Sequence, residues 1–170
     1  MGLKNGRNNA STRNNHSPNK LVKSQGKATT FQQALQRHLT AIQAHDLDTF
    51  LDTIANDGSL TLILPNGSYL DDYEEIVELH KEWFADQQWQ MTTELVATHE
   101  SAEMASALSL VTYEDVDEEG QPVELQYFLN LLFAKQDNKW VVVHDQNTIT
   151  DLMDEDDDDD DADDLGEDNE

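Results

Sequence analysis

Two histidines are the residues suited to acid–base chemistry, because an imidazole exchanges a proton near neutral pH. His38 interrupts an apolar helical stripe, and His144 shares one face of a predicted strand with Gln146, whose amide can hydrogen-bond but cannot transfer a proton. Alternation along a strand fixes which residues share a face, but not which face points inward. We expect His144 and Gln146, rather than Asp145 and Asn147, to face the interior. If the chain is catalytic, His38 and His144 are its predicted acid–base pair.

Three further residues are candidates for ligand binding. Asn130 is the polar residue in the middle of the apolar segment 127–133, and a buried amide needs hydrogen-bond partners. It either orients a ligand or holds a neighbouring strand. His80 and Trp83 lie on the apolar face of one predicted helix. The simpler alternative is that both histidine rings of the helices are buried and hydrogen-bonded in the core and that Trp83 is a core residue.

The sequence shows no pattern of residues typical of a metal site. His38 and His45 are seven residues apart, which is about 10 Å along a helix and too far for one ion. Cysteine is absent from the sequence, so disulfides and thiol chemistry are excluded. We therefore predict no metal site and no cofactor.

The hydrophobic pattern that must position these residues changes near residue 89. Before that point, apolar residues spaced by three and four predict three helices, which begin at the capping box Thr30–Gln33, at Asp46 and at Asp71. A short strand, Leu60–Leu64, is predicted between the second and third helices. After that point, strict alternation predicts four long strands joined by hairpins, namely Trp89–His99, Met104–Tyr113, Val123–Ala134 and Trp140–Thr148.

Helices followed by strands predict an α+β fold, in which one curved antiparallel sheet wraps over three N-terminal helices. The result is a cone whose mouth can hold a small molecule. The strand Val123–Ala134 is apolar on both faces, with Leu129 and Leu131 pointing one way and Phe128 and Leu132 the other. Helices cover one face only, so we predict a homodimer through the outer face of the sheet.

Charge divides the chain into three parts. Residues 1–28 carry six bases and no acid, and residues 151–170 carry fourteen acids and no base, which predicts a disordered basic arm and a disordered acidic tail. Residues 29–150 hold 22 acids and 4 bases, a net charge of 4 − 22 = −18, and form the predicted domain. Such acidity disfavours nucleic acid and anionic membranes as partners. With no secretory or membrane-spanning pattern, we expect a cytoplasmic protein.

Three stretches carry a family resemblance. The first, Ala34–Asp48, holds a predicted helix followed by the pattern Ala-x-Asp-Leu-Asp. The second, Gly67–Phe84, holds a glycine turn and the third predicted helix. The last, Lys139–Thr148, is a predicted final strand with a Trp followed by apolar residues. In this order and spacing, residues 29–150 resemble the nuclear transport factor 2-like superfamily, in its SnoaL-like and steroid-isomerase-like branch. The resemblance implies a cystatin-like roll around a conical pocket. It implies no particular activity, because one fold hosts many.

The same resemblance puts catalysis in doubt. Steroid-isomerase-like members use a Tyr to polarise a carbonyl and an Asp as base, and these positions fall on His38 and on Leu62 or Leu64. An apolar side chain cannot abstract a proton. A second His that many SnoaL-like members carry on the last strand falls on Gln146. Whether the chain is an enzyme stays open.

The expected function is the binding of a small, apolar or neutral organic molecule in the cone. The alternative is a non-catalytic dimerisation or interaction module whose charged tails contact partners. A cavity lined by His38, Asn130 and Gln146 would favour ligand binding. A cone filled by Trp83, Phe84 and Leu62 would favour the module.

Overall fold

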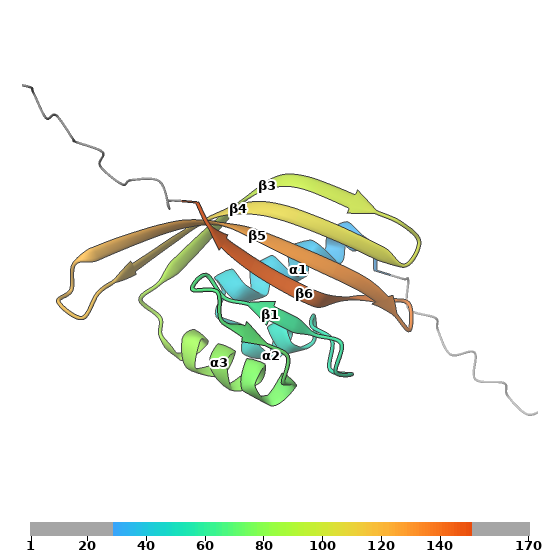
Figure 1. Cartoon of the computed structure of the whole chain (residues 1–170), viewed down its shortest axis with the longest axis horizontal. Helices are drawn as coiled ribbons and strands as arrows, with labels where there is room; N and C mark the ends of the chain where they lie inside the picture. Colours follow the sequence, from blue (N-terminus) through green and yellow to red (C-terminus); the bar gives the residue numbers. More distant parts are fainter. Residues whose placement is uncertain (1–28, 151–170) are drawn as a thin grey trace, which may run out of the picture.

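The computed structural model describes residues 29–150, and the predicted arm and tail lie outside the described residues. Figure 1 shows the long strands forming an arch, with the helices on its concave side. This confirms the predicted α+β fold with a curved sheet. The elements are α1 (Phe31–Gln43), α2 (Leu47–Leu51), β1 (Thr61–Ile63), β2 (Tyr69–Leu70), α3 (Tyr73–Ala85), β3 (Gln90–Glu100), β4 (Met104–Val116), β5 (Pro122–Gln136) and β6 (Lys139–Ile149).

The helices begin at side chains that satisfy their free backbone N–H groups. The capping box of α1 is confirmed: Gln33 N donates to Thr30 Oγ1 over 3.2 Å, and Thr30 N donates to Gln33 Oε1 over 3.1 Å. Asp46 accepts from Thr49 N at 3.0 Å and caps α2, as predicted. The start predicted for α3 was wrong by one residue, because Asp72, not Asp71, accepts from the first helical N–H groups.

The sheet is mixed rather than wholly antiparallel. Its strand order is β2-β1-β6-β5-β4-β3, and β3 to β6 form the predicted antiparallel meander. β1 pairs in parallel with β6, which places Leu62 beside Asp145. β2, which was not predicted, returns antiparallel to β1 after a turn in which Gly67 has a φ of 82°. β2, α3 and three long strands separate β1 from β6 in the chain, and a connection of this length permits parallel pairing.

A β-bulge in β6 decides which side chains face inward. Phe133 pairs with Val142, whereas Leu132 pairs with His144, so Val143 is an extra residue without a partner. A bulge of this kind shifts the alternation of a strand by one. Trp140 and Val142 face the concave side before the bulge, and after it Asp145 and Asn147 do so, paired with buried Leu131 and Leu129. The expectation that His144 and Gln146 face inward was therefore wrong.

The core fills the concave side of the sheet. Phe31 of α1 makes edge contacts with Phe133 and Trp140, at ring-centroid distances of 5.3 and 5.9 Å. On β5, alternate side chains from Tyr127 to Phe133 are buried, whereas Phe128 on the opposite face keeps 39% of its surface exposed. The prediction that the two faces of this strand are both apolar, with one covered by helices, is confirmed.

Candidate functional site

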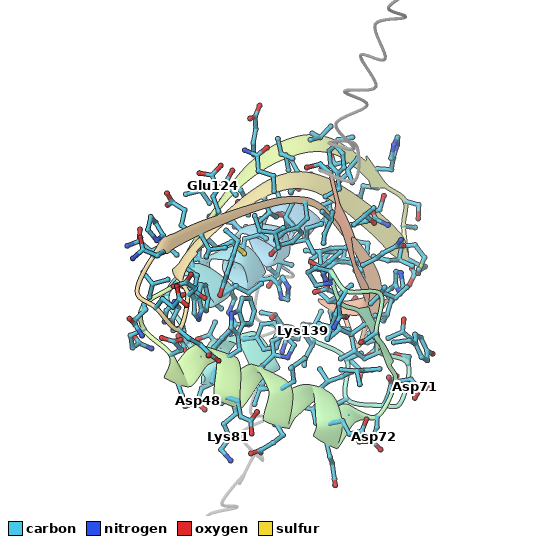
Figure 2. The ribbon with its side chains drawn as sticks, turned by 60° about the vertical axis from the view of Figure 1, so that its left-hand side comes forward. Asp48, Asp71, Asp72, Lys81, Glu124 and Lys139 are labelled. Atoms are coloured by element: carbon cyan, nitrogen blue, oxygen red, sulfur yellow. The ribbon has the colours of Figure 1, made fainter. Side chains whose placement is uncertain are left out.

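A cavity of about 290 Å³ lies between the concave face of the sheet and α3. Figure 2 shows side chains from the sheet and from α3 converging on the space that they enclose. Most of the wall is apolar, which is typical of sites for small organic ligands. The residues that line it are Ile42, Leu62, Leu64, Pro65, Leu79, His80, Trp83, Met91, Tyr113, Leu125, Tyr127, Leu129, Asp145 and Asn147.

Asp145 is the acid in this wall. The residue as a whole is half-buried, and its neighbours across the sheet are Leu62 on β1 and Leu131 on β5, both buried. Burial in this apolar surrounding raises the pKa of Asp145 to about 7, and the hydrogen bond from Asn147 opposes the rise only in part. The cavity therefore contains a carboxyl that is partly protonated at neutral pH.

Asn147 fixes the orientation of that carboxyl. Its Nδ2 donates to Asp145 Oδ1 and to the backbone oxygen of Ile63, each over 2.9 Å. Both amide hydrogens are thereby used. Asp145 Oδ2 and Asn147 Oδ1 make no hydrogen bond within residues 29–150, so two oxygen acceptors remain available at the cavity wall.

His80 adds a third acceptor from α3. Its Nδ1 lies 2.7 Å from the backbone oxygen of Ile76, so Nδ1 must carry the hydrogen and Nε2 a lone pair. Burial lowers the pKa of His80, which keeps the ring neutral. The ring stacks on Phe50 at a centroid distance of 4.2 Å, which holds it against the cavity.

An aromatic stack forms one side of the cavity. Trp83 lies on Trp89 with ring centroids 4.4 Å apart and planes 14° apart. Trp89 Nε1 donates to the backbone oxygen of Trp83 over 2.9 Å, which locks the two rings together. Trp89 is fully buried and only Trp83 lines the cavity, so Trp83 presents a rigid aromatic surface to its contents.

Two tyrosines complete the wall with hydroxyls that are already engaged. Tyr113 Oη donates to Asp115 over 2.9 Å, and burial raises the pKa of Tyr113 to about 12. Tyr127 Oη donates to Met91 Sδ over 3.6 Å, and burial raises its pKa as well. Both phenols stay neutral at any physiological pH, and neither has a hydrogen free for a ligand.

His38 is buried next to the cavity but does not line it. Thr53 Oγ1 donates to the backbone oxygen of Phe50 over 2.6 Å, so the 2.8 Å contact with His38 requires that His38 Nδ1 donates to Thr53. The His38 Nε2 atom is buried without a hydrogen-bond partner. Burial, and secondarily the nearby His80, lowers the pKa of His38 to about 3. The ring is a neutral core group at physiological pH.

The other predicted site residues lie on the outer face of the sheet. Gln146 pairs with Asn130 there, and both line a shallow depression beside Phe128. His144 Nδ1 lies 2.6 Å from Thr61 Oγ1 on the same side. His38 contacts the concave face, so the sheet separates it from His144, and the structure does not bring the predicted acid–base pair together.

Of the sequence predictions, His80 and Trp83 are in the cavity wall, as are Leu62 and Leu64, the positions that correspond to the isomerase base. Asp145 and Asn147 were missed as site residues because the bulge at Val143 reversed their face. Within the described part of the chain, no group of three or more possible ligands is placed to hold a metal ion. Nor does any helix described here have the length and apolarity needed to cross a bilayer.

Solved structures with the same fold support this architecture. The association domain of C. elegans CaMKII is 22% identical, with a TM-score of 0.53 over 66% of this chain and 88% of that one. A ketosteroid isomerase-like protein from Erwinia carotovora atroseptica is 20% identical, with a TM-score of 0.58 over 69% and 91%. A nuclear transport factor 2-like superfamily protein from Salmonella enterica is 18% identical, with a TM-score of 0.58 over 71% and 91%.

At these identities the likeness shows the shared fold alone. No curated protein matches the chain. The family model for the SnoaL-like domain matches residues 32–150, which is the whole of the folded domain except for its first residues. The α+β cone, its cavity and this match together place the chain in the SnoaL-like domain family.

Proposed function

We propose that this chain binds a small organic molecule in the cavity, with the polar end of the molecule at Asp145 and Asn147 and its hydrocarbon part against Trp83 and the leucines. The observation that carries the proposal is a carboxyl group in an apolar cavity of about 290 Å³. Placing an acid there costs stability unless something compensates for it. Groups held at such a cost, with a pKa shifted by burial, are concentrated at functional sites.

The proposal includes the role of Asp145 if the bound molecule is converted. With a pKa of about 7, the carboxyl can both give and accept a proton at neutral pH, and Asn147 holds it in one orientation. His38 lies outside the cavity wall and His144 on the outer face, so neither is placed to exchange a proton with the contents. Asp145 is the group that would do so.

We also propose that two copies associate through the outer face of the sheet. Leu108, Leu110, Phe128 and Leu132 form an apolar patch there, and in the described chain no helix covers it. An uncovered apolar patch on a sheet is typical of a protein–protein interface. The similarity in fold to the association domain of C. elegans CaMKII supports this proposal, because that protein's name describes an association role.

Native mass spectrometry of the freshly purified full chain tests the binding proposal. The expected result is an added mass that disappears on denaturation. A matched pair of variants on β5 then locates it: Leu125→Trp fills the cavity, whereas Val123→Trp places the same side chain at an exposed position two residues away on the same strand. Loss of the added mass only in Leu125→Trp supports the cavity as the site. Retention in both variants overturns it.

For a chain that is purified without added mass, the same pair of variants is titrated with 2-phenylethanol, a neutral probe small enough for the cavity. Binding to the natural chain and to Val123→Trp, but not to Leu125→Trp, supports the proposal. Equal binding of the probe to all three proteins contradicts it.

A further inference from the structure

When Asp145 is ionised, the polar atoms that remain free at the cavity wall are all hydrogen-bond acceptors. Asp145 Oδ2 and Asn147 Oδ1 have no partner in residues 29–150, and the tautomer of His80 leaves a lone pair on Nε2. The donors of the wall are engaged elsewhere. Asn147 Nδ2 donates to Asp145 and Ile63, and the two tyrosine hydroxyls donate to other side chains. A ligand that satisfies this wall has to bring the hydrogens itself.

No basic side chain of the described domain reaches the cavity. Arg37 and Lys139 both contact Asp52, each at 2.6 Å, on the surface formed by α1 and the start of β6. Lys81 contacts Glu78 at 3.1 Å, and Figure 2 shows it on the side of α3 that faces away from the sheet. Lys135 lies over the ring of Trp140, 5.5 Å from its centroid. These are the four bases of residues 29–150, so the ionised form of Asp145 has no cationic partner within the domain.

The surroundings of the cavity attract positive charge. The domain as a whole carries 4 − 22 = −18, and a surface of one sign concentrates ligands of the opposite sign. Inside, Trp83, Tyr113 and Tyr127 line the wall with aromatic rings, whose faces attract cations. Ionised Asp145 and the negative charge of the domain would both repel an anionic ligand.

We propose that the cavity selects a protonated organic amine, whose ammonium group donates hydrogen bonds to Asp145 Oδ2 and Asn147 Oδ1 while its apolar body lies against Trp83 and the leucines. This inference rests on the proposed function and adds the charge class of the ligand. An ammonium group brings several donors and the charge that the carboxylate lacks. A hydroxyl brings one donor and no charge, and a carboxylate brings neither.

Three probes of nearly equal size separate these classes: 2-phenylethylamine, 2-phenylethanol and phenylacetate, titrated calorimetrically into the full chain at pH 8. At that pH the amine is protonated and most of Asp145 is ionised. The expected order is amine first, the alcohol weaker by about tenfold or more, and no detectable binding of the acid. Binding of the alcohol equal to or tighter than that of the amine overturns the amine proposal and leaves the proposed cavity function standing. Failure of all three probes contradicts both.

Two variants with the same change of net charge test whether Asp145 causes the preference for the amine over the alcohol. Asp145→Asn keeps the shape of the side chain and should reduce the advantage of the amine over the alcohol to within about twofold, since the charged acceptor is gone. Glu118→Gln, in the exposed turn between β4 and β5, should leave that advantage unchanged. Binding of 2-phenylethanol to Asp145→Asn shows that the variant still forms the cavity. An equal loss of the advantage in both variants would assign the selectivity to the general field and overturn the role of Asp145.

Discussion

Asn147 Nδ2 donates to Asp145 Oδ1 over 2.9 Å on one face of β6. Alternation puts the two residues on the same face of the strand, and the bulge at Val143 turns that face toward the cavity. The amide stabilises the ionised carboxyl, but burial outweighs it, and the pKa of Asp145 rises to about 7. One strand thus supplies both the acid of the cavity and the group that orients it.

Asp145→Asn is expected to stabilise the chain at alkaline pH. Folding raises the pKa of Asp145 from 3.8 to about 7, so the folded chain binds this proton more tightly than the unfolded chain does. The free energy of unfolding therefore falls as pH rises from about 4 to about 7. The amide never ionises and escapes this loss. We expect the variant to exceed the natural chain by roughly 2 to 4 kcal/mol in free energy of unfolding at pH 8, and by little at pH 4.

Urea unfolding followed by circular dichroism, at pH values from 4 to 8, measures this difference. A gain that is the same at every pH would mean that packing, rather than ionisation, explains it. A loss of stability at pH 8 would contradict the account of Asp145.

His38→Gln is expected to flatten the acid side of the stability curve. Burial lowers the pKa of His38 from 6.5 to about 3. Between these pH values, the unfolded chain binds a proton on this ring and the folded chain does not. Stability from this group is complete above pH 6.5 and is lost progressively as pH falls toward 3. The natural chain should lose roughly 3 to 5 kcal/mol more than the variant over that range. Urea titrations extended down to pH 3 provide the comparison, and parallel curves for the two proteins would refute a buried neutral His38.

Binding of 2-phenylethylamine is expected to strengthen as pH rises from 6 to 8, because the ammonium group needs an ionised Asp145. The other titratable groups facing Asp145 are His80 from α3, Tyr113 from β4 and Tyr127 from β5. The pKa of His80 is lowered and those of both tyrosines are raised, and each of these shifts favours the neutral form of the group. Calorimetry should give a pH-dependent affinity for the natural chain and a flat one for Asp145→Asn. An affinity for the natural chain that falls with rising pH would be inconsistent with this assignment.

Phe128→Glu is expected to convert a dimer into monomers. Phe128 lies in the centre of the outer face, paired with Leu110, and keeps 39% of its surface exposed. Burying a charge in an apolar interface without a partner is strongly unfavourable. Tyr69→Glu, at the far edge strand β2, adds the same charge at a side chain that is 57% exposed. Light scattering after size-exclusion chromatography should show a dimer for the natural chain and for Tyr69→Glu, and a monomer for Phe128→Glu. Identical masses for all three proteins would show that the outer face of the sheet is not the dimer interface.

The long elements could be predicted from the sequence because each repeats its pattern several times. Alternate residues of β5 are apolar over its inner length, and the apolar stripe of α3 includes Ile76, His80 and Phe84, which are buried as predicted. β1 and β2 span three and two residues. Strands so short have no period to read, so the second of them and the parallel pairing of the first with β6 were not predictable.

The candidate site was predicted only in part, for a similar reason. His80 and Trp83 lie on a regular helix, and their direction follows from its period. Asp145 and Asn147 follow a bulge, and one extra residue reverses the face of every later side chain on the strand. The sequence does contain a signal, since Asp145 is the acid within the otherwise acid-free strand Lys139–Ile149. That signal marks the residue as unusual but cannot place it inside.

The most direct test of ligand binding in the cavity is a titration of the ¹⁵N-labelled full chain with 2-phenylethylamine, followed by ¹H–¹⁵N correlation spectra. The side-chain N–H groups report separately on the two faces of the sheet. We predict shifts of the Asn147 amide and the Trp83 indole, which lie at the cavity, with the Asn130 and Gln146 amides of the outer face unmoved. Shifts confined to Asn130 and Gln146, or none at all at saturating probe, would contradict a ligand site in the cavity.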